Sequence, residues 1–237
     1  MSVAEGLVDA LEAHALGAWP AAIVVQEDGW TLRATPGLDR ARSNNALPGA
    51  RPGAIACVER FAAAHGIRPG IQVSPLHRHA ALDGELEARG WTVSWPVRVQ
   101  VGAVAGFAAT EPELVVSDEA DTRWLACWEA AEGRDDGAAH AATVFAALRG
   151  RACFGRLGDA AVGLAVPGAG LTGLFCLAVR DDARRGGLGT RLVCGLCHVA
   201  GEPQAYLQVE QTNAAALGLY ERLGFVDAYR YHHRQAP

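Results

Sequence analysis

The feature that most constrains the fold is an apolar segment that leads through an arginine- and glycine-rich bend directly into an amphipathic helix. The apolar segment ends at Val179, the bend covers 180–187, and the helix begins at Leu188. Leu192 and Leu196 continue one apolar face of this helix, which can pack against a sheet. A helix that follows a strand at once is typical of a crossover between parallel strands. The pattern therefore predicts an α/β or α+β fold with a mixed sheet.

The bend itself is a candidate anion site. Main-chain N–H groups in such a bend and in the first helical turn bind anions. Glycine lets that backbone approach a phosphate closely, and arginine adds charge for a diphosphate. The residues concerned are Arg184, Arg185, Gly186, Gly187, Leu188, Gly189 and Thr190. The alternative is a tight turn without a ligand. The glycine spacing does not match the G-x-G-x-x-G of dinucleotide-binding folds.

A second segment, 207–225, has the same strand-then-helix character. Thr212 or Asn213 is a candidate N-cap, and Leu217 and Tyr220 fall on one helix face. Gly224 ends the helix, and an aromatic residue follows it. The segment therefore predicts a strand over 205–209 and a helix over 214–223.

Together the two segments resemble the GNAT superfamily of acyl-CoA N-acyltransferases. The family's pyrophosphate signature, R/Q-x-x-G-x-G/A after a strand, is matched by Arg184, Gly187 and Gly189, although Asp181 stands where a proline is usual. The family's later pattern, L-x-V-x-x-x-N-x-x-A-x-x-L-Y-x-x-x-G-F, matches residues 207–225. The resemblance covers about 113–234 and implies a twisted mixed sheet flanked by helices.

The resemblance also implies a mechanism with acetyl-CoA as co-substrate and no metal. The backbone of Leu177, Ala178 and Val179 would bind the pantetheine arm, residues 184–190 would bind the pyrophosphate, and Asn213 would contact the cofactor. Tyr220 would protonate the leaving thiolate as general acid. A primary amine would attack the thioester directly, so no cysteine is needed as nucleophile. The alternative for Tyr220 is a packed aromatic side chain.

The general base is less well defined by the sequence. Glu210, at the end of a late strand, could accept the amine proton directly or through water. The competing interpretation is a structural carboxylate that caps the following helix. Glu132, Asp135 and Asp136 lie in a loop that lines the acceptor site in the family, although charged loops are usually only solvated. Trp124 and Trp128 are predicted to be core or groove residues.

The chain divides into two similar-sized domains, 1–105 and 106–237. The first has no Arg-x-x-Gly-x-Gly turn and is similar to the degenerate N-terminal domain of tandem GNAT proteins. Residues 82–91 echo 217–225, each a helix that ends at glycine before an aromatic residue. We expect the first domain to pack on the second and help form the acceptor groove, with 30–33 and 43–47 as candidate ligand contacts.

Composition excludes several other classes of function. The chain of 237 residues has no lysine, so it can form neither a pyridoxal-phosphate Schiff base nor a Walker loop. A net charge of −5 leaves no basic surface for nucleic acid, and no apolar run could cross a membrane. No export signal is recognisable, so we expect a cytoplasmic protein.

The cysteines and histidines indicate neither metal nor haem. Six cysteines are spread along the chain and are predicted to be small buried apolar residues. Cys194 to His198 matches C-x-x-C-H, but haem attachment requires export to an oxidising compartment. His77 and His79 have no partners at metal-ligand spacing.

The sequence therefore predicts an acetyl-CoA-dependent N-acetyltransferase that acts on a small-molecule or peptide amine. The alternative is a catalytically silent acyl-CoA-binding or regulatory module. Tyr220 favours the enzyme, whereas the undefined base leaves the module open. No pattern in the sequence specifies the amine, the acyl length or the oligomeric state.

Overall fold

The computed structural model describes residues 5–107, 111 and 113–237. In these residues the strands are β1 (Ile23–Glu27), β2 (Trp30–Ala34), β3 (Asn45–Pro48), β4 (Gly70–Val73), β5 (Thr92–Ala103), β6 (Leu114–Ser117), β7 (Cys153–Leu157), β8 (Ala161–Gly168), β9 (Leu171–Val179), β10 (Gln204–Glu210) and β11 (Val226–Gln235). The helices are α1 (Glu5–Ala18), α2 (Ile55–His65), α3 (Ala80–Ala88), α4 (Thr122–Glu132), α5 (Gly137–His140), α6 (Leu188–Ala200) and α7 (Ala214–Arg222).

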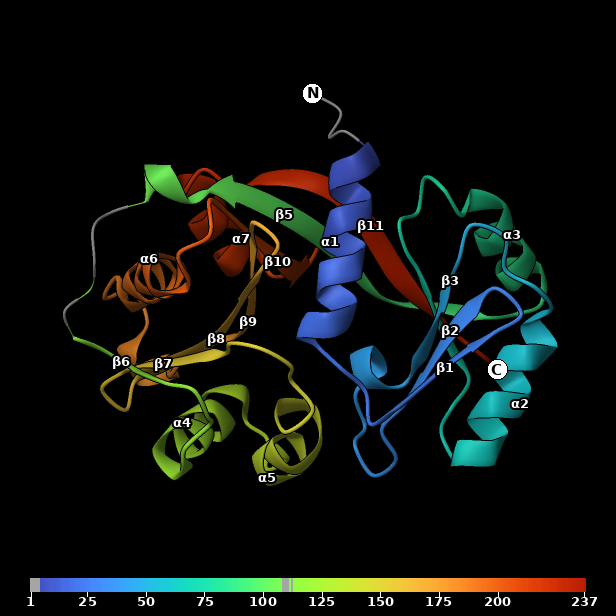
Figure 1. The fold of residues 1–237 in the computed structure, drawn as a ribbon, viewed down its shortest axis with the longest axis horizontal. Coiled ribbons are helices and arrows are strands. Elements are labelled where there is room, and N and C mark those ends of the chain that lie inside the picture. Colours follow the sequence, from blue (N-terminus) through green and yellow to red (C-terminus); the bar gives the residue numbers. More distant parts are fainter. Residues whose placement is uncertain (1–4, 108–110, 112) are drawn as a thin grey trace.

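The strands form one continuous sheet in the order β1-β2-β3-β4-β11-β5-β10-β9-β8-β7-β6. The sheet is mixed, since β3 pairs with β4 and β9 with β10 in parallel while the other neighbours are antiparallel. This confirms the predicted fold class. In Figure 1, α2 and α3 accompany β1–β4, α4–α6 accompany β6–β9, and α1 lies in front of β5 and β11.

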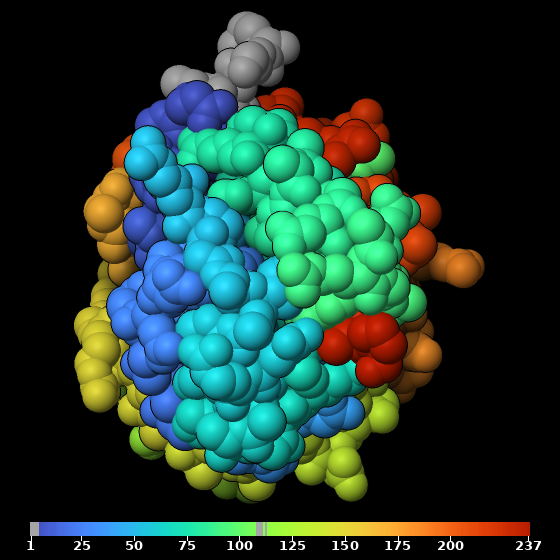
Figure 2. Space-filling view, turned by 90° about the vertical axis from the view of Figure 1, so that its right-hand side faces the viewer, coloured from blue at the N-terminus to red at the C-terminus, as the bar shows by residue number. Residues whose placement is uncertain are grey.

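The two halves of the chain exchange strands at the centre of the sheet. β5, which closes the first half, pairs along Val97–Ala103 with β10 of the second half. In return, β11 reaches into the first half and pairs antiparallel with β4. Figure 2 shows the C-terminal residues, in red, surfacing among the cyan and green residues of the first half. The sheet is therefore continuous across the predicted boundary at 105/106, and the domain division stays a prediction.

The second half packs helices on both faces of the sheet because its strands are apolar on both faces. On β8, Val162, Leu164 and Val166 join a core with Trp124 of α4. Ala161 and Ala165, which point to the opposite face, join a core with Leu192 of α6. This double coverage fixes the position of α6, and with it the arginine- and glycine-rich bend, at the carboxyl end of β9.

Most predicted elements are present, with two local corrections. β3 was not anticipated as a strand, because its four residues include a proline and show no alternation. The sequence offers Asp118 as an N-cap candidate for the helix that carries Trp124, but the N-cap of α4 is Asp121, which accepts the hydrogen bond from the Trp124 amide at 2.7 Å. Within the described ranges, no helix is long and apolar enough to cross a bilayer.

Candidate active site

β9 and β10 separate halfway along their length and leave an opening in the sheet. Their parallel pairing joins Leu171–Leu174 to Gln204–Leu207 and goes no further. Beyond it, β9 carries a β-bulge opposite β8, where Cys176 and Leu177 face the single residue Gly163. The bulge turns the carboxyl end of β9 away from β10, and the resulting opening is lined by main-chain groups.

A second bulge faces this opening from the other side. On β5, Trp95 and Pro96 lie opposite the single residue His232 of β11. Trp95 has φ +47° and Cys176 has φ +52°, values that side chains other than glycine rarely adopt. Strained backbone of this kind concentrates at functional sites. Both residues line the same cavity.

A cavity of about 940 Å³ lies between the end of β9, the start of α6 and α7. It contains almost every residue that the sequence proposed for cofactor binding: Leu177, Ala178, Val179, Arg184, Arg185, Gly187, Leu188, Gly189, Thr190 and Asn213. Gly186 is in the same bend but does not line the cavity wall. Tyr220 forms part of its far end.

The first turn of α6 is free to bind an anion. Gly187 is its N-cap, with φ +78°, and no side chain accepts a hydrogen bond there. By contrast, Asp121 caps α4 and Asn213 caps α7 through their side chains. A Cβ on Gly189 would lie 3.1 Å from Leu219 Cδ2, so a side chain here would press against α7.

Arginine also lies at this cavity, although partly engaged. The Arg184 Nε donates to the Val179 carbonyl at 3.2 Å, and its Nη2 pairs with Asp181 at 2.7 Å. These contacts are exposed, so a diphosphate can displace the carboxylate at little cost. Arg185 adopts φ +66°, which turns the backbone between Arg184 and Gly187. The residues present therefore fit a bound diphosphate.

Tyr220 lies where this cavity meets a second one. Its side chain is 7% exposed, its ring packs on Phe225, and its hydroxyl has no hydrogen-bond partner among the described residues. Burial raises the pKa of Tyr220 to about 12, so the hydroxyl keeps its proton at neutral pH. A protonated hydroxyl that has no partner among the described residues, on a ring that lines both cavities, suits a proton donor better than a packing role alone.

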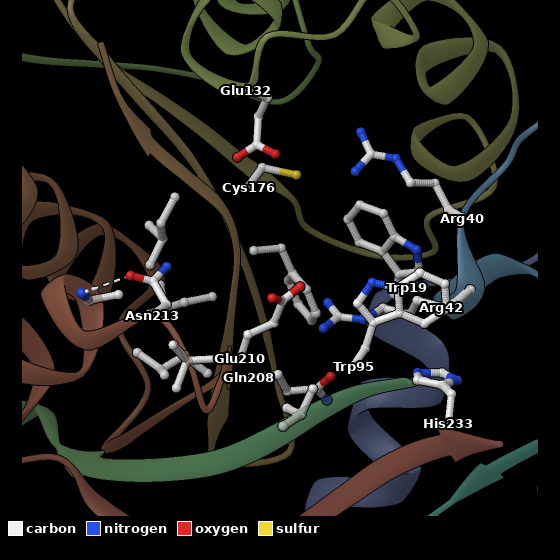
Figure 3. Close-up of a pocket in the computed structure, with 18 of the residues that line it drawn as sticks. Trp19, Arg40, Arg42, Trp95, Glu132, Cys176, Gln208, Glu210, Asn213 and His233 are labelled. Atoms are coloured by element: carbon white, nitrogen blue, oxygen red, sulfur yellow. Dashed lines mark hydrogen bonds between the residues drawn. The ribbon is translucent and has the colours of Figure 1, made fainter. Parts of the chain in front are cut away.

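The second cavity, of about 480 Å³, opens between the two halves of the chain. It shares Glu132, Leu177, Asn213, Ala216 and Tyr220 with the first. Figure 3 shows that Trp19, Arg40, Arg42, Trp95 and His233 line one side, and that Gln208, Glu210 and Asn213 come from the other. The first half of the chain therefore contributes one wall of this cavity.

Glu210 is placed at the boundary of the two sites, as an exposed carboxylate at the end of β10. It lines the second cavity, and its side chain has no hydrogen bond or ion pair with another described residue. The cap of α7 is Asn213, whose Oδ1 accepts from the Ala216 amide at 3.1 Å. The alternative of a helix-capping Glu210 is therefore wrong, because Asn213 already fills that role.

The acidic loop residues have three different environments. Glu132 is exposed and lines both cavities. Asp136 is engaged by Arg40 through two hydrogen bonds of 3.0 Å, which outweigh its partial burial and hold its pKa below the usual value. Asp135 is exposed and lines neither cavity.

The two tryptophans of α4 also have different environments. Trp124 is buried in the core and donates to main-chain carbonyls of β7 and β8. Trp128 is also buried, but it lines the second cavity, with the Arg40 guanidinium 5.7 Å from its ring. The prediction of a core or groove role thus covers both.

Sequence reasoning missed much of the second cavity. The proposed contact segments 30–33 and 43–47 do not line it; the neighbouring residues 39–42 do. β2 and β3 occupy those segments and are buried. One local pattern could have indicated part of this cavity. Pro96 follows Trp95 inside a strand, and proline in a paired strand indicates a bulge. His233, near the end of the sequence, has no informative pattern around it, yet the pairing of β11 carries it into the cavity wall.

The cysteines follow the prediction with one exception. Five of the six are buried, whereas Cys176 is half-buried and lines the second cavity. Its burial raises the pKa of the thiol far above the usual value, so it stays protonated. No group of three potential metal ligands occurs among the residues that the structure describes.

Comparison with known proteins decides the family. A family model described as "Probable histone acetyltransferase Rv0428c C-terminal" matches residues 7–235. The chain belongs to this family. With the fold described above, the family places the chain in the GNAT superfamily of acetyltransferases, as the two sequence motifs indicated.

Curated relatives match only a short segment. The mycothiol acetyltransferase of Streptomyces coelicolor is 46% identical over 56 residues, which is 22% of this chain and 18% of that protein. The mycothiol acetyltransferase of Streptomyces scabiei is 48% identical over the same length, again 18% of that protein. The chain thus covers less than a fifth of these curated relatives.

Solved structures match over much more of the chain. A GCN5-related N-acetyltransferase from Kribbella flavida covers 100% of this chain and 96% of its own, with a TM-score of 0.68 and 14% identity. A tandem GNAT protein from the clavulanic acid biosynthesis pathway covers 81% of this chain and 74% of its own, with a TM-score of 0.53 and 13% identity. At these identities the likeness concerns the GNAT fold.

Proposed function

We propose that this GNAT protein transfers an acetyl group from acetyl-CoA directly to a primary amine. The observation that carries the proposal is the meeting of two cavities at Tyr220. One cavity presents the uncapped start of α6, which suits a diphosphate. The other is lined by carboxylates, arginines and aromatic rings, which suits a polar acceptor.

The acetyl thioester supplies the activated carbonyl, and the chain supplies position and protons. Main-chain groups of 177–179 hold the pantetheine arm along the bulged end of β9, and an amide there polarises the carbonyl oxygen. The amine nitrogen attacks the carbonyl carbon, so that a C–N bond forms and the C–S bond breaks. Tyr220 gives its proton to the departing sulfur, and solvent later restores it.

The amine must also lose a proton, and Glu210 is the proposed acceptor. Its carboxylate has no partner among the described residues, lines the acceptor cavity and stands at the end of β10, three residues before Asn213. An exposed carboxylate acts through a water molecule more readily than by direct contact with a bulky amine. Glu132, across the cavity, is available to attract the substrate's ammonium form.

The experiment is a thiol-release assay with acetyl-CoA and a panel of primary amines, run beside thermal unfolding with CoA alone. Amine-dependent thiol release together with stabilisation by CoA supports the proposal. Stabilisation without turnover on any amine would favour a silent acyl-CoA-binding module. If CoA gave no stabilisation and no amine gave turnover, the assignment of CoA as the cofactor would itself be wrong.

A further inference from the structure

Arg42 is a cation in the acceptor cavity that has no carboxylate partner among the described residues. Its guanidinium lies 5.8 Å from the Trp19 ring centre and 5.9 Å from that of Phe175. It also lies near Tyr231, whose hydroxyl donates to Gln208 Oε1 at 2.8 Å. The guanidinium thus packs against two aromatic rings, and no described carboxylate lies within ion-pair distance of it.

A second arginine beneath the cavity strengthens the positive potential. Arg33 is 3% exposed, donates one hydrogen bond to the Trp19 carbonyl and leaves its Nε without a partner. It has no ion pair with a described residue. Burial and the nearby charge of Arg42 lower the pKa of Arg33 to about 10, so it remains charged at neutral pH. Two neighbouring arginines that no described carboxylate pairs with favour an anionic ligand.

The other arginines of the cavity do not share this property. Arg40 is held by Asp136 through two hydrogen bonds, and Arg134 lies 3.8 Å from the same carboxylate. Both therefore already have an acid of the chain as an ion-pair partner, which they share. Arg42 alone among the described cavity arginines lacks a compensating carboxylate.

Positive and negative side chains lie on different sides of the acceptor cavity. Figure 3 shows Arg42 on the side contributed by the first half, with Glu210 on the opposite side and Glu132 above. Glu132 lines both cavities, as Tyr220 and Asn213 do, and Glu210 lines the acceptor cavity three residues before Asn213. An acceptor with an ammonium group and an anion would place its nitrogen at the carboxylates, beside the thioester, and its anion at Arg42.

We propose that Arg42 binds a carboxylate of the acceptor, so that the substrate is a small primary amine carrying a carboxyl group, such as a free amino acid. The planar guanidinium matches a planar carboxylate through paired hydrogen bonds. A dianionic phosphate fits less well, because Asp39, Glu132 and Glu210 line the same cavity and would repel it. This inference rests on the proposed amine acetylation and specifies its substrate class.

The test compares each amino acid with the amine formed by removing its carboxyl group, for example L-phenylalanine with 2-phenylethylamine and L-leucine with 3-methylbutylamine. In the unaltered protein, kcat/KM should favour the amino acid by about 10- to 100-fold, the range for a charge-assisted hydrogen bond. Arg42→Gln should bring that ratio close to one. Arg60→Gln removes the same charge from a 67% exposed site on α2 and should leave the ratio unchanged.

The ratio is insensitive to partial misfolding, because a loss of active protein lowers both rates equally. A ratio near one in the unaltered protein, or an unchanged ratio in Arg42→Gln, would overturn the inference. Calorimetric titration with N-acetyl-L-phenylalanine tests the carboxylate site without turnover. Binding that weakens about tenfold or more in Arg42→Gln supports the site even if amine acetylation fails, and no binding to the unaltered protein rejects it.

Discussion

The Asp28 carboxylate accepts a hydrogen bond at 3.0 Å from the Ala54 amide, at the start of α2. A Cβ on the adjacent Gly53 would lie 1.9 Å from that carboxylate, so the β1–β2 turn is packed directly against the helix start. In the second half, α6 begins at Gly187 with no such acid. The two halves thus differ at the position where a GNAT fold would bind a diphosphate.

This difference predicts one CoA site per chain. Calorimetric titration with CoA should give a stoichiometry of one. Asp28→Ala should lower the free energy of unfolding by about 0.5–1.5 kcal/mol, the usual net contribution of one hydrogen bond, and leave the stoichiometry unchanged. Two sites per chain, in either protein, would contradict the assignment of α6 as the diphosphate site.

Gly189→Glu should abolish CoA binding. The new side chain would meet Leu219, where only 3.1 Å is available to a Cβ, and would bring negative charge to the first turn of α6. Gly84→Glu on α3 is the matched control, because a Cβ there meets nothing within 4 Å. Calorimetry measures both, and retained affinity in Gly189→Glu would disprove the site.

Tyr220→Phe should lower kcat by about ten- to a thousandfold with little change in CoA affinity, as expected for a general acid. Because burial raises the pKa of Tyr220 to about 12, this group should cause no loss of kcat between pH 7 and about pH 11. Tyr206→Phe is the control, since Tyr206 is buried against His14 outside both cavities. An unchanged kcat in Tyr220→Phe would remove it from the mechanism.

Cys176→Ala should keep kcat within about threefold of the unaltered protein, although Cys176 lines the acceptor cavity. Its raised pKa keeps the thiol protonated and a poor nucleophile, and direct attack by the amine needs no acyl-enzyme. Mass spectrometry of the protein incubated with acetyl-CoA alone should detect no acetylated Cys176. A stable acetyl adduct, or ping-pong kinetics, would point to covalent catalysis.

His233 should make the protein less stable as the pH falls below about 6.5. Burial, and then the charge of Arg42, lower the pKa of His233 to about 3, whereas in the unfolded chain it has the ordinary value of 6.5. The unfolded state therefore binds a proton between these values and the folded state does not, so stability is lost as pH falls from 6.5 toward 3. Urea midpoints across this range should vary less in His233→Gln, and an NMR titration of His233 near pH 6 would refute the shift.

The lining of the cavity proposed for the cofactor could be predicted almost completely from sequence because its features are local. Residues 184–190 are proposed to bind through their own backbone, and a glycine pattern between a strand and a helix indicates that backbone conformation directly. Asn213 was likewise recognisable as a helix cap by its place before an apolar helix. Such features depend only on residues that are adjacent in the chain, so they can be recognised in the sequence alone.

The acceptor side was decided only by the tertiary structure. Arg42, Trp95 and His233 lie far apart in the chain, and the only local signal among them is the bulge that Pro96 indicates beside Trp95. They meet because β11 of the second half lies between β4 and β5 of the first half, and β5 lies between β11 and β10. Bulges at Trp95 and Cys176 then open the sheet. Pairing between distant strands depends on the packing of the whole sheet, so no local pattern could specify which side chains face this cavity.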